Sequence, residues 1–472
     1  MSDINGILNI GLSALQAAKT GVEVTAQNIA NVDTPGYSQK EVVLGPKKGT
    51  EGPPYFFNGV EVSEIKRAYD EELAREISAQ QSRSSYWQTS EEYLARIEEI
   101  FSESDQSGLR SDLDLFWNAW QKLSTNPSGY GERQEVAAAG NRLSETLSSR
   151  SSDLQEIMAN INRQVSKNME EINQILQKIA ELNRQISESI GGQVNEYKDR
   201  QVNEYKDRLD KLIEDLSEQI NVNYWQDKNG QVTVSLNGHS LVEGNQAATL
   251  TSATDEQGHT VVQKKLADGT LIDVTERINA GKVAGLLSLG NKIIPGYLEK
   301  LDKLAFGLSQ KVNEQHQSGY GLDGSTGVNF FKPLDTSANA ARNLALNPDI
   351  ENNLDLIAAS SSPEVPDNEN AIKIADLQRN SAFEEGSQLL TANDYYASLY
   401  RTIGRDTQQA QAKSDQQRLI VNNLKDRRSM ISDVALDEQL ANLIKFQQTY
   451  NASAKIISTA DQMMSTLLNL SI

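Results

Sequence analysis

The chain of 472 residues contains no cysteine, which excludes disulfide bonds, thiolate metal sites, iron–sulfur clusters and cysteine nucleophiles. It has only three histidines, so a multi-histidine metal site would need His239, His259 and His316 together. Acidic residues outnumber basic ones by 65 to 45, and the net charge of −20 argues against a nucleic-acid partner, which requires a positive face.

Long hydrophobic runs are also missing. No stretch approaches the ~18 apolar residues of a membrane-spanning helix, so we expect no membrane insertion. The first residues lack the basic start and apolar run of a secretory signal peptide. We therefore expect any export to use a route that does not depend on a signal peptide. Apolar side chains make up 38% of the chain and prolines number ten, which is typical of long helices with thin cores.

Both ends of the chain carry apolar residues at heptad spacing. Near the N-terminus a row of large side chains runs beside a row of small ones, Gly11, Ala18 and Thr25, and the helix ends before Pro35. The simpler interpretation is an internal coiled coil of the two ends. The sharper one is that these helices build a polymer, in which neighbouring molecules supply the rest of a thin core. The predicted assembly interface is Leu8, Leu15, Val22, Ile29, Leu436, Leu443, Tyr450, Ile457 and Met464.

A long helix is predicted in the first half of the chain. Apolar residues step by three, four and seven from 132 to 190, and one helix of that length would extend ~90 Å and need partner helices. The octet QVNEYKDR at 193–200 is repeated at 201–208. An eight-residue step leaves an ~80° phase error on a helix, so we place the repeat at a hairpin tip before a returning helix.

From about residue 221 the spacing of the apolar residues changes from the helical period to the alternation of strands. Alternating residues with Asn-Gly and Asp-Gly turn signals predict a small antiparallel β unit over 221–275. Helices are predicted over 281–289, from Pro295 onward, and from Phe383 to the end with a break near Ser432.

We therefore predict a mainly α fold with a β-rich insertion, in about three domains. The terminal segments, 1–35 with 432–472, form a coiled-coil-like core domain. A long-helix bundle domain comprises 36–220, 276–318 and 381–431. A small outer antiparallel β domain comprises 221–275, and whether 319–380 joins it is left open.

No motif indicates an enzyme. The G-x-G-x-x-G match at 319–324 follows a helix rather than a strand, so we interpret it as a flexible turn. Paired acids such as Glu71 and Glu72 lie on helices beside arginines, which favours a solvated face. His316 is expected to be exposed or to cap a helix end. We predict no catalytic residue, no cofactor and no metal site.

Two segments resemble a known family. Asn28-Ile-Ala-Asn31-Val-Asp-Thr34-Pro-Gly36-Tyr37-Ser38 resembles the N-terminal signature shared by bacterial flagellar rod, hook and hook-associated proteins, and 437–457 resembles their shared C-terminal helix. Internal segments at 281–287, 294–302 and 316–331 are similar to the hook-associated members. The residues of this chain that match the N-terminal signature of the family are Asn28, Ala30, Asn31, Thr34, Gly36 and Tyr37.

The resemblance implies a structural component of the bacterial flagellum that serves motility. It would form the hook–filament junction and be needed for filament assembly on the hook; the alternative is another axial protein, the hook protein or hook-associated protein 3. The implied partners are further copies of the chain in a helical ring or tube, the hook protein, hook-associated protein 3, and a cytoplasmic export chaperone at the C-terminal segment. The implied location is extracellular, reached by type III export without a cleaved signal peptide.

Overall fold

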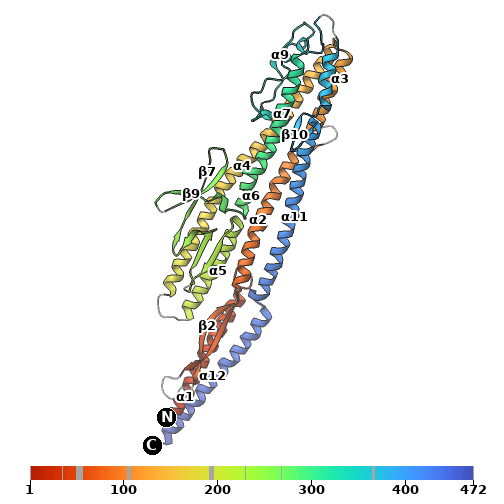
Figure 1. Ribbon diagram of the computed structural model, residues 1–472. Helices are drawn as coiled ribbons and strands as arrows, with labels where there is room; N and C mark the ends of the chain where they lie inside the picture. Colours follow the sequence, from red (N-terminus) through yellow and green to blue (C-terminus); the bar gives the residue numbers. More distant parts are fainter. Residues whose placement is uncertain are drawn as a thin grey trace.

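The computed structural model is an elongated rod with both chain termini at one end (Figure 1). It is mainly α with small antiparallel sheets, as predicted. In the described part of the chain, no helix combines the length and the apolar character needed to cross a membrane. The structure describes residues 2–34, 36–48, 57–103, 108–190, 196–228, 230–266, 268–363 and 367–470.

One end of the rod is a terminal unit made from the first and last helices and a hairpin. α1 (Ser2–Ala30) packs along α12 (Leu436–Leu470), and we call these two helices the terminal pair. The antiparallel hairpin of β1 (Lys40–Lys48) and β2 (Phe57–Arg67) packs on α1. α12 is separated by a short break, residues 433–435, from α11 (Ala392–Ser432), and we call this break the elbow. Pro35, used above as a stop signal, lies outside the described residues.

Long helices form the middle of the rod (Figure 1). α2 (Glu71–Ile100) runs beside α11, and α3 (Leu109–Thr125) packs on α4 (Tyr130–Ile190). The 61 residues of α4 form one helix of ~90 Å, as the periodicity predicts. α5 (Glu196–Gln219) returns along α4 and also packs on α2.

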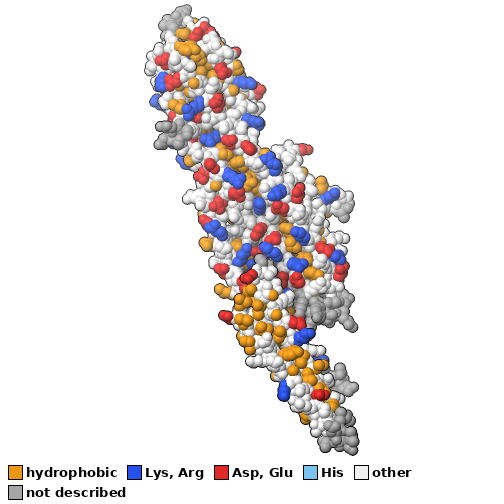
Figure 2. All heavy atoms as spheres, turned by 180° about the vertical axis from the view of Figure 1, so that it is seen from behind, with side chains coloured by type: hydrophobic (Ala, Val, Ile, Leu, Met, Phe, Trp, Pro, Cys, Tyr) orange, Lys and Arg blue, Asp and Glu red, His pale blue; other side chains and the backbone are white. Residues whose placement is uncertain are grey.

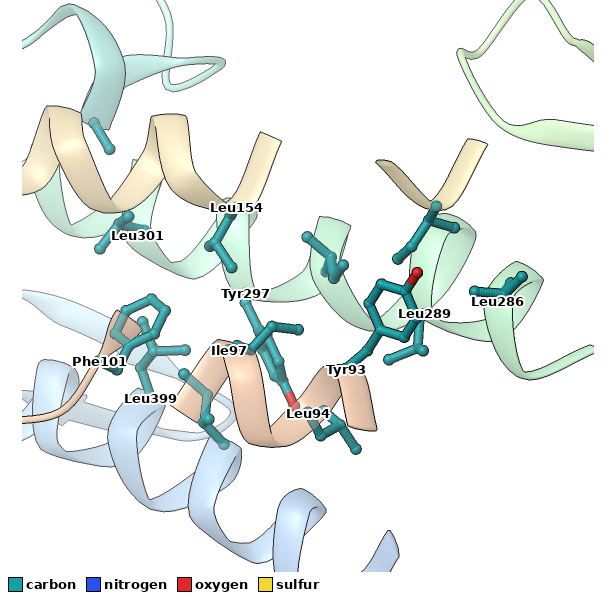
Figure 3. Close-up of a cluster of buried hydrophobic side chains, with 14 of the residues drawn as sticks. Tyr93, Leu94, Ile97, Phe101, Leu154, Leu286, Leu289, Tyr297, Leu301 and Leu399 are labelled. Carbon is teal, nitrogen blue, oxygen red and sulfur yellow. The ribbon is translucent and has the colours of Figure 1, made fainter. Parts of the chain in front are cut away.

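The core of the bundle is a row of large apolar side chains, each from the inward face of its helix. Figure 3 shows one layer of it, in which α2 meets α7 (Ile294–Gln317), α4 and α11. Burial of such side chains supplies the main stabilisation of the rod. The residues labelled there are Tyr93, Leu94, Ile97, Phe101, Leu154, Leu286, Leu289, Tyr297, Leu301 and Leu399.

The β-rich insertion forms two antiparallel sheets against α4. The first has the order β3-β4-β5-β6 and the second β7-β8-β9, all antiparallel. Asn183 and Asn173 of α4 each bond the N–H and C=O of one strand residue, Val232 and Leu250, at 2.7–2.8 Å. The strands are β3 (Asn223–Gln226), β4 (Val232–Leu236), β5 (His239–Glu243), β6 (Gln246–Ala247), β7 (Thr249–Thr254), β8 (Thr260–Lys265) and β9 (Leu271–Asp273).

The predicted helix start at Phe383 is wrong, and the one at Pro295 is confirmed. The segment from Phe383 begins with a hairpin, β10 (Phe383–Glu385) and β11 (Gln388–Leu390), because Gly386 takes the left-handed backbone of a tight turn with φ +62°. α7 begins at Ile294 with Pro295 in its first turn, where a proline needs no N–H partner. It follows α6 (Lys282–Ser288) through the π-helical segment η2 (Leu289–Ile293) without a break.

Residues 319–380 lie at the far end of the rod and do not lie against either sheet (Figure 1). Their described short helices pack on α3, α4 and α7. The short elements of this region and of the preceding turn are η1 (Thr275–Arg277), α8 (Ala340–Asn343), α9 (Pro348–Asn352), η3 (Leu354–Leu356), α10 (Glu369–Asp376) and η4 (Leu377–Arg379).

The expectation that His316 is exposed or capping is wrong. Its side chain is fully buried between two backbone segments of the far end. Nδ1 lies 2.7 Å from the carbonyl oxygen of Val328, and the N–H of Ala358 donates to Nε2 over 2.9 Å. Burial lowers the pKa of His316 to about 4, so the ring is neutral and joins the two segments.

The placement of the repeat at a free hairpin tip is wrong for its second copy. Residues 201–208 lie within α5, where Asn203 and Asp207 are buried. Asn203 Nδ2 donates to the carbonyl oxygen of Ile65 over 2.7 Å, and Asp207 pairs with Arg67. The phase of this copy is therefore set by packing on β2, while residues 193–195 of the first copy lie outside the described residues.

Candidate assembly surface

Small residues line the seam of the terminal pair, and large side chains of α12 pack against them. Gly11, Ala18 and Thr25 of α1 are buried, and Ser453 and Ala460 lie on the facing side of α12. The predicted interface residues flank this seam. Leu8, Leu15, Val22, Ile29, Leu443, Ile457 and Met464 are half-buried, whereas Leu436 and Tyr450 are exposed.

Glycine allows the two helices to approach closely. A Cβ atom at Gly21 would lie 2.5 Å from the ring of Phe446, and one at Gly11 would lie 2.9 Å from Cγ1 of Ile457. Neither position therefore accepts a larger residue unless the facing side chain of α12 or the helix itself shifts. The seven-residue spacing of the small row was visible in the sequence, but its role as the centre of contact was not.

Close packing through small residues leaves large apolar side chains on the outside. Leu436, Leu440 and Ile444 follow one face of α12 at four-residue spacing, each 46% exposed or more. Met430, which is 87% exposed, and Ile431 lie beside the elbow at the end of α11. We call these five residues the outer apolar face. Figure 2 shows hydrophobic side chains gathered over this lower part of the rod.

Further apolar side chains are exposed elsewhere on the terminal pair. Soluble monomers rarely expose contiguous apolar areas of this kind, and such areas mark contacts with other molecules. The additional exposed residues are Ile7, Ile10 and Leu12 of α1 and Tyr450, Ile456, Met463 and Leu467 of α12.

Asn28, a residue of the family signature, joins several segments of the terminal unit by hydrogen bonds. Its Oδ1 accepts hydrogen bonds from Tyr37 Oη at 2.8 Å and from the N–H of Lys40 at 3.0 Å. Its Nδ2 donates to the carbonyl oxygen of Lys40 at 2.9 Å and to Oε1 of Gln439 at 3.0 Å. One buried amide thus links α1, the loop after it, β1 and α12 with all of its hydrogen-bonding capacity used.

The other signature residues shape the turn after α1. Asn31 Nδ2 donates to the carbonyl oxygen of Gln27, and Thr34 Oγ1 donates to Asn31 Oδ1. Gly36 has φ +81°, a conformation that favours glycine. Ala30, Thr34 and Gly36 are exposed, while Asn31 and Tyr37 are half-buried.

The elbow is tied to the same loop. The N–H of Gln39 donates to the carbonyl oxygen of Ser432 at the end of α11, over 2.8 Å, and the carbonyl oxygen of Gln39 accepts from the N–H of Ala68. Gln39, Lys40 and Gln439 could not be found from the sequence, because they are polar residues without a hydrophobic pattern: Gln39 lies in the loop after α1, Lys40 opens β1 and Gln439 lies in α12.

A buried ion cluster joins the terminal unit to α5. Arg67 Nη1 lies 2.8 Å from both Asp207 Oδ1 and Asp210 Oδ2, and Tyr69 Oη donates to Asp210 over 3.1 Å. Burial raises the pKa of both carboxyl groups against the attraction of Arg67. The cluster fixes the α4–α5 hairpin, which we call the arm, against β2.

Within the described residues no group of three or more histidine or acidic side chains is arranged to hold a metal ion. The features of the site are packing, exposed apolar surface and buried hydrogen bonds.

The two ends of the chain match families of flagellar axial proteins. The model "Flagella basal body rod protein" matches residues 8–37, and "Flagellar basal body rod FlgEFG protein C-terminal" matches 430–470. These are the two segments that form the terminal pair. The two ends of the chain are thus similar to flagellar basal body rod proteins.

The middle of the chain identifies the family. The model "Flagellar hook-associated protein FlgK helical domain" matches residues 94–331, half of the chain. This protein therefore belongs to the flagellar hook-associated protein family that this domain defines.

Curated relatives are similar over nearly the full length. The flagellar hook-associated protein 1 of Bacillus subtilis is 26% identical over 496 residues, with 97% of this chain and 96% of the relative covered. That of Escherichia coli is 26% identical over 560 residues, with 99% and 100% covered. The flagellar hook junction protein FlgK of Burkholderia pseudomallei has a similar fold, with a TM-score of 0.66, 14% identity, and 75% and 99% of the two chains covered.

Proposed function

We propose that this chain is a structural component of the bacterial flagellum that forms the hook–filament junction and is needed for filament assembly on the hook. Family membership and full-length relatives named flagellar hook-associated protein 1 support this role. The observation that carries it is the outer apolar face beside a terminal pair whose own seam is already filled.

The terminal segments, 1–35 with 432–472, would form the inner core domain of a ring or tube. A contact of one surface with a different surface of the next copy generates such an open assembly. The helical bundle, 36–220 with 276–318 and 381–431, would surround this core, and the sheets of 221–275 would lie outermost. The predicted interface residues Leu8, Leu15, Val22 and Ile29 would line contacts between neighbouring pairs.

The proposal includes specific partners and a location. Further copies of the chain, the hook protein and hook-associated protein 3 would contact the assembled ring, and a cytoplasmic chaperone would bind the C-terminal segment before export. The exposed apolar residues of α12 are the kind of surface that such a chaperone covers. The chain would leave the cell by type III export without a cleaved signal peptide and act as a structural protein, not an enzyme.

The test replaces two residues of the outer apolar face, Leu440→Glu with Ile444→Glu, in the full chain. We expect the variant to reach the medium but to be absent from hook tips, with filament protein shed beside it. Leu419→Glu, at a 63% exposed site on α11, is the matched control and should assemble normally. Normal filaments on the double variant, seen by electron microscopy, would overturn the proposal.

A deletion strain separates the alternative axial roles. Long bare hooks that shed filament protein favour the junction role. Absent hooks favour the hook protein, and the chain would then be assigned to that position in the axis.

A further inference from the structure

The terminal unit and the helical bundle are two bodies with separate apolar cores. The buried core of the bundle takes its residues from between Tyr93 and Ala410, and no described residue of α1, α12 or the β1–β2 hairpin belongs to it. The terminal pair has a seam of its own, in which Gly11 and Gly21 face α12. No continuous apolar core therefore holds the two bodies at one angle, and relative motion is the general expectation where such a core is missing.

The chain passes between the two bodies at two places that lie side by side. Residues 68–70 lead from β2 into α2, and the elbow leads from α11 into α12 (Figure 1). Gln39 joins these passages, because its carbonyl oxygen accepts from the N–H of Ala68 and its N–H donates to the carbonyl oxygen of Ser432, both over 2.8 Å. Two short, adjacent passages form a hinge, in which a few residues at the ends of elements absorb a rotation.

Polar side chains hold the two bodies together beside this hinge. Among the described elements, the largest packing contact between the terminal unit and the bundle is that of β2 on α5. Arg67 Nη1 lies 2.8 Å from Oδ1 of Asp207 and from Oδ2 of Asp210, and Asn203 donates to the carbonyl oxygen of Ile65. We call Arg67, Asp207 and Asp210 the latch.

The polar character of the latch allows it to open. Burial of a guanidinium with carboxylates removes water from every charged group, and this penalty roughly offsets the attraction between the groups. An opened latch returns the three side chains to water and uncovers no residue of the bundle core. The two bodies can therefore separate here without the large loss of apolar burial that opening either body would cause.

Space for a rotation lies beside the latch. A cleft of about 990 Å³, which Asp207 lines, separates Asn31 in the loop after α1 from Gln177 of α4. A second cavity, of about 90 Å³, is lined by Asp210 and by Ser432 at the elbow. The contact between the two bodies is thus confined to a narrow polar strip with room next to it.

We propose that the terminal unit is hinged on the bundle at residues 68–70 and the elbow, and that the latch sets its angle. With the latch closed, α12 and its outer apolar face are held in one orientation to the long axis of the bundle. With the latch open, the terminal unit turns about the hinge and the face takes a range of orientations. The inference goes beyond the proposed function, because it describes the single chain and is tested without any assembly.

Distances between pairs of spin labels test the hinge, because a chain without cysteine accepts thiols at chosen sites. Ser187→Cys on α4 with Gln448→Cys on α12 is the pair across the hinge, at two exposed positions. The matched control pairs, also exposed, lie within one body each: Ser187→Cys with Gln416→Cys in the bundle, and Gln16→Cys with Gln462→Cys in the terminal unit. Pulsed electron spin resonance on the purified, monomeric full chain gives the distance distribution of each pair.

Arg67→Glu is the variant that opens the latch, because it places a third carboxylate beside Asp207 and Asp210. We expect the distribution across the hinge to broaden at least about twofold, while both control pairs keep the distributions of the parent chain. Arg67→Glu combined with Asp207→Lys and Asp210→Lys reverses every charge of the latch and should narrow the distribution again.

An unchanged distribution across the hinge in Arg67→Glu would overturn the proposal, and so would a parent chain that is already as broad as this variant. Asp210→Asn is a milder variant, which keeps the pair of Arg67 with Asp207 and should broaden the same distribution less. Broadening of the pair within the terminal unit in both variants would also overturn the proposal, because the latch would then keep that unit folded rather than set its angle.

Discussion

Asn28 and Gln439 are 411 positions apart in the sequence and share a hydrogen bond of 3.0 Å between Nδ2 and Oε1. Both side chains are buried, with 1% and 2% of their surface exposed. The bond fixes the register of α1 against α12 next to the elbow, and the remaining bonds of Asn28 tie the same point to Lys40 and Tyr37. The position of α1 and of the loop after it therefore depends on contacts with the C-terminal helix α12.

This bond predicts an energetic coupling. Asn28→Leu leaves buried groups of Lys40 and Gln439 without partners and should destabilise the terminal unit by ~1–3 kcal/mol. Gln439→Leu should cost less alone, and the double variant should show a coupling of ~0.5–3 kcal/mol, measured by hydrogen exchange of α12 amides. Gln448→Leu, at an exposed site of α12, is the control. Strictly additive effects would show that the bond does not couple the two helices.

The close approach of α1 and α12 predicts that alanine substitutions at two glycines of α1 have opposite effects on stability. Gly21→Ala places a Cβ against the ring of Phe446 and should destabilise the pair by ~1–3 kcal/mol. Gly6→Ala meets no atom within 4 Å and should be neutral or stabilising by up to ~1 kcal/mol, because alanine favours the helix. Adding Phe446→Leu should recover part of the loss at Gly21. The measurement is urea unfolding followed by hydrogen exchange; equal effects of the two glycine variants would contradict the model of a tight seam.

The repeat predicts a tolerated deletion. Removing 193–200 or 201–208 yields the same sequence, and either way one copy of the octet precedes Leu209 in its present phase. The bonds made by Asn203 and Asp207 should therefore survive, and the Tm should change by less than about 2 °C, below the shift that ~1 kcal/mol produces in a domain of this size. Asn203→Leu with Asp207→Asn is the contrasting variant and should lower the Tm. A deletion variant as unstable as this double variant would show that the first copy carries essential contacts.

His316 predicts acid sensitivity of the far end. Its pKa is about 4 when folded, below the ordinary 6.5, so the unfolded chain binds the extra proton first. The contribution of the neutral ring is complete above pH ~6.5 and is lost as pH falls towards ~4, at ~1.4 kcal/mol per pH unit. Arg133, buried on α4, disfavours the charged ring as well.

The measurement compares urea unfolding at pH 7 and pH 5 for the parent chain and His316→Gln. The parent should lose ~2 kcal/mol more than the variant over this interval. The comparison is needed because the raised pKa values of Asp207 and Asp210 make protonation favour the folded state, which opposes the histidine effect. His259→Gln, at an exposed position, is the control. An identical pH response of the parent chain and His316→Gln contradicts the assignment.

The regular spacing of apolar residues predicted the long elements, because each of them buries one continuous face. The 61-residue helix α4 and the strands within 223–273 lie where their spacing indicated. Short elements were missed for the opposite reason. The hairpin at Phe383 and the π-helical passage at Leu289 depend on local turn geometry and on neighbours across the bundle, which heptad spacing does not record.

The candidate site was predictable only in part. The sequence marked the signature residues and the heptad rows, since these lie in one contiguous segment each. It did not show that Gly11 and Gly21 are the points of closest approach, that Gln439 bonds Asn28, or that Gln39 bonds Ser432, because these contacts join segments some 400 residues apart. Arg67 with Asp207 and Asp210 is a second example, since its partners become neighbours only when α5 returns to β2.

The sequence by itself determined that this protein is a cysteine-free, acidic, mainly helical chain with matching heptads at its two ends, and those heptads with the signature pointed to its family. Such properties depend on composition and local spacing, which need no partner. The tertiary structure decided which of two parallel rows is buried, which large residues remain outside, and where a cleft stays open. Those outcomes follow from close packing, because glycine lets α1 and α12 approach along a row of small residues, while large apolar side chains such as Leu440 and Ile444 stay exposed.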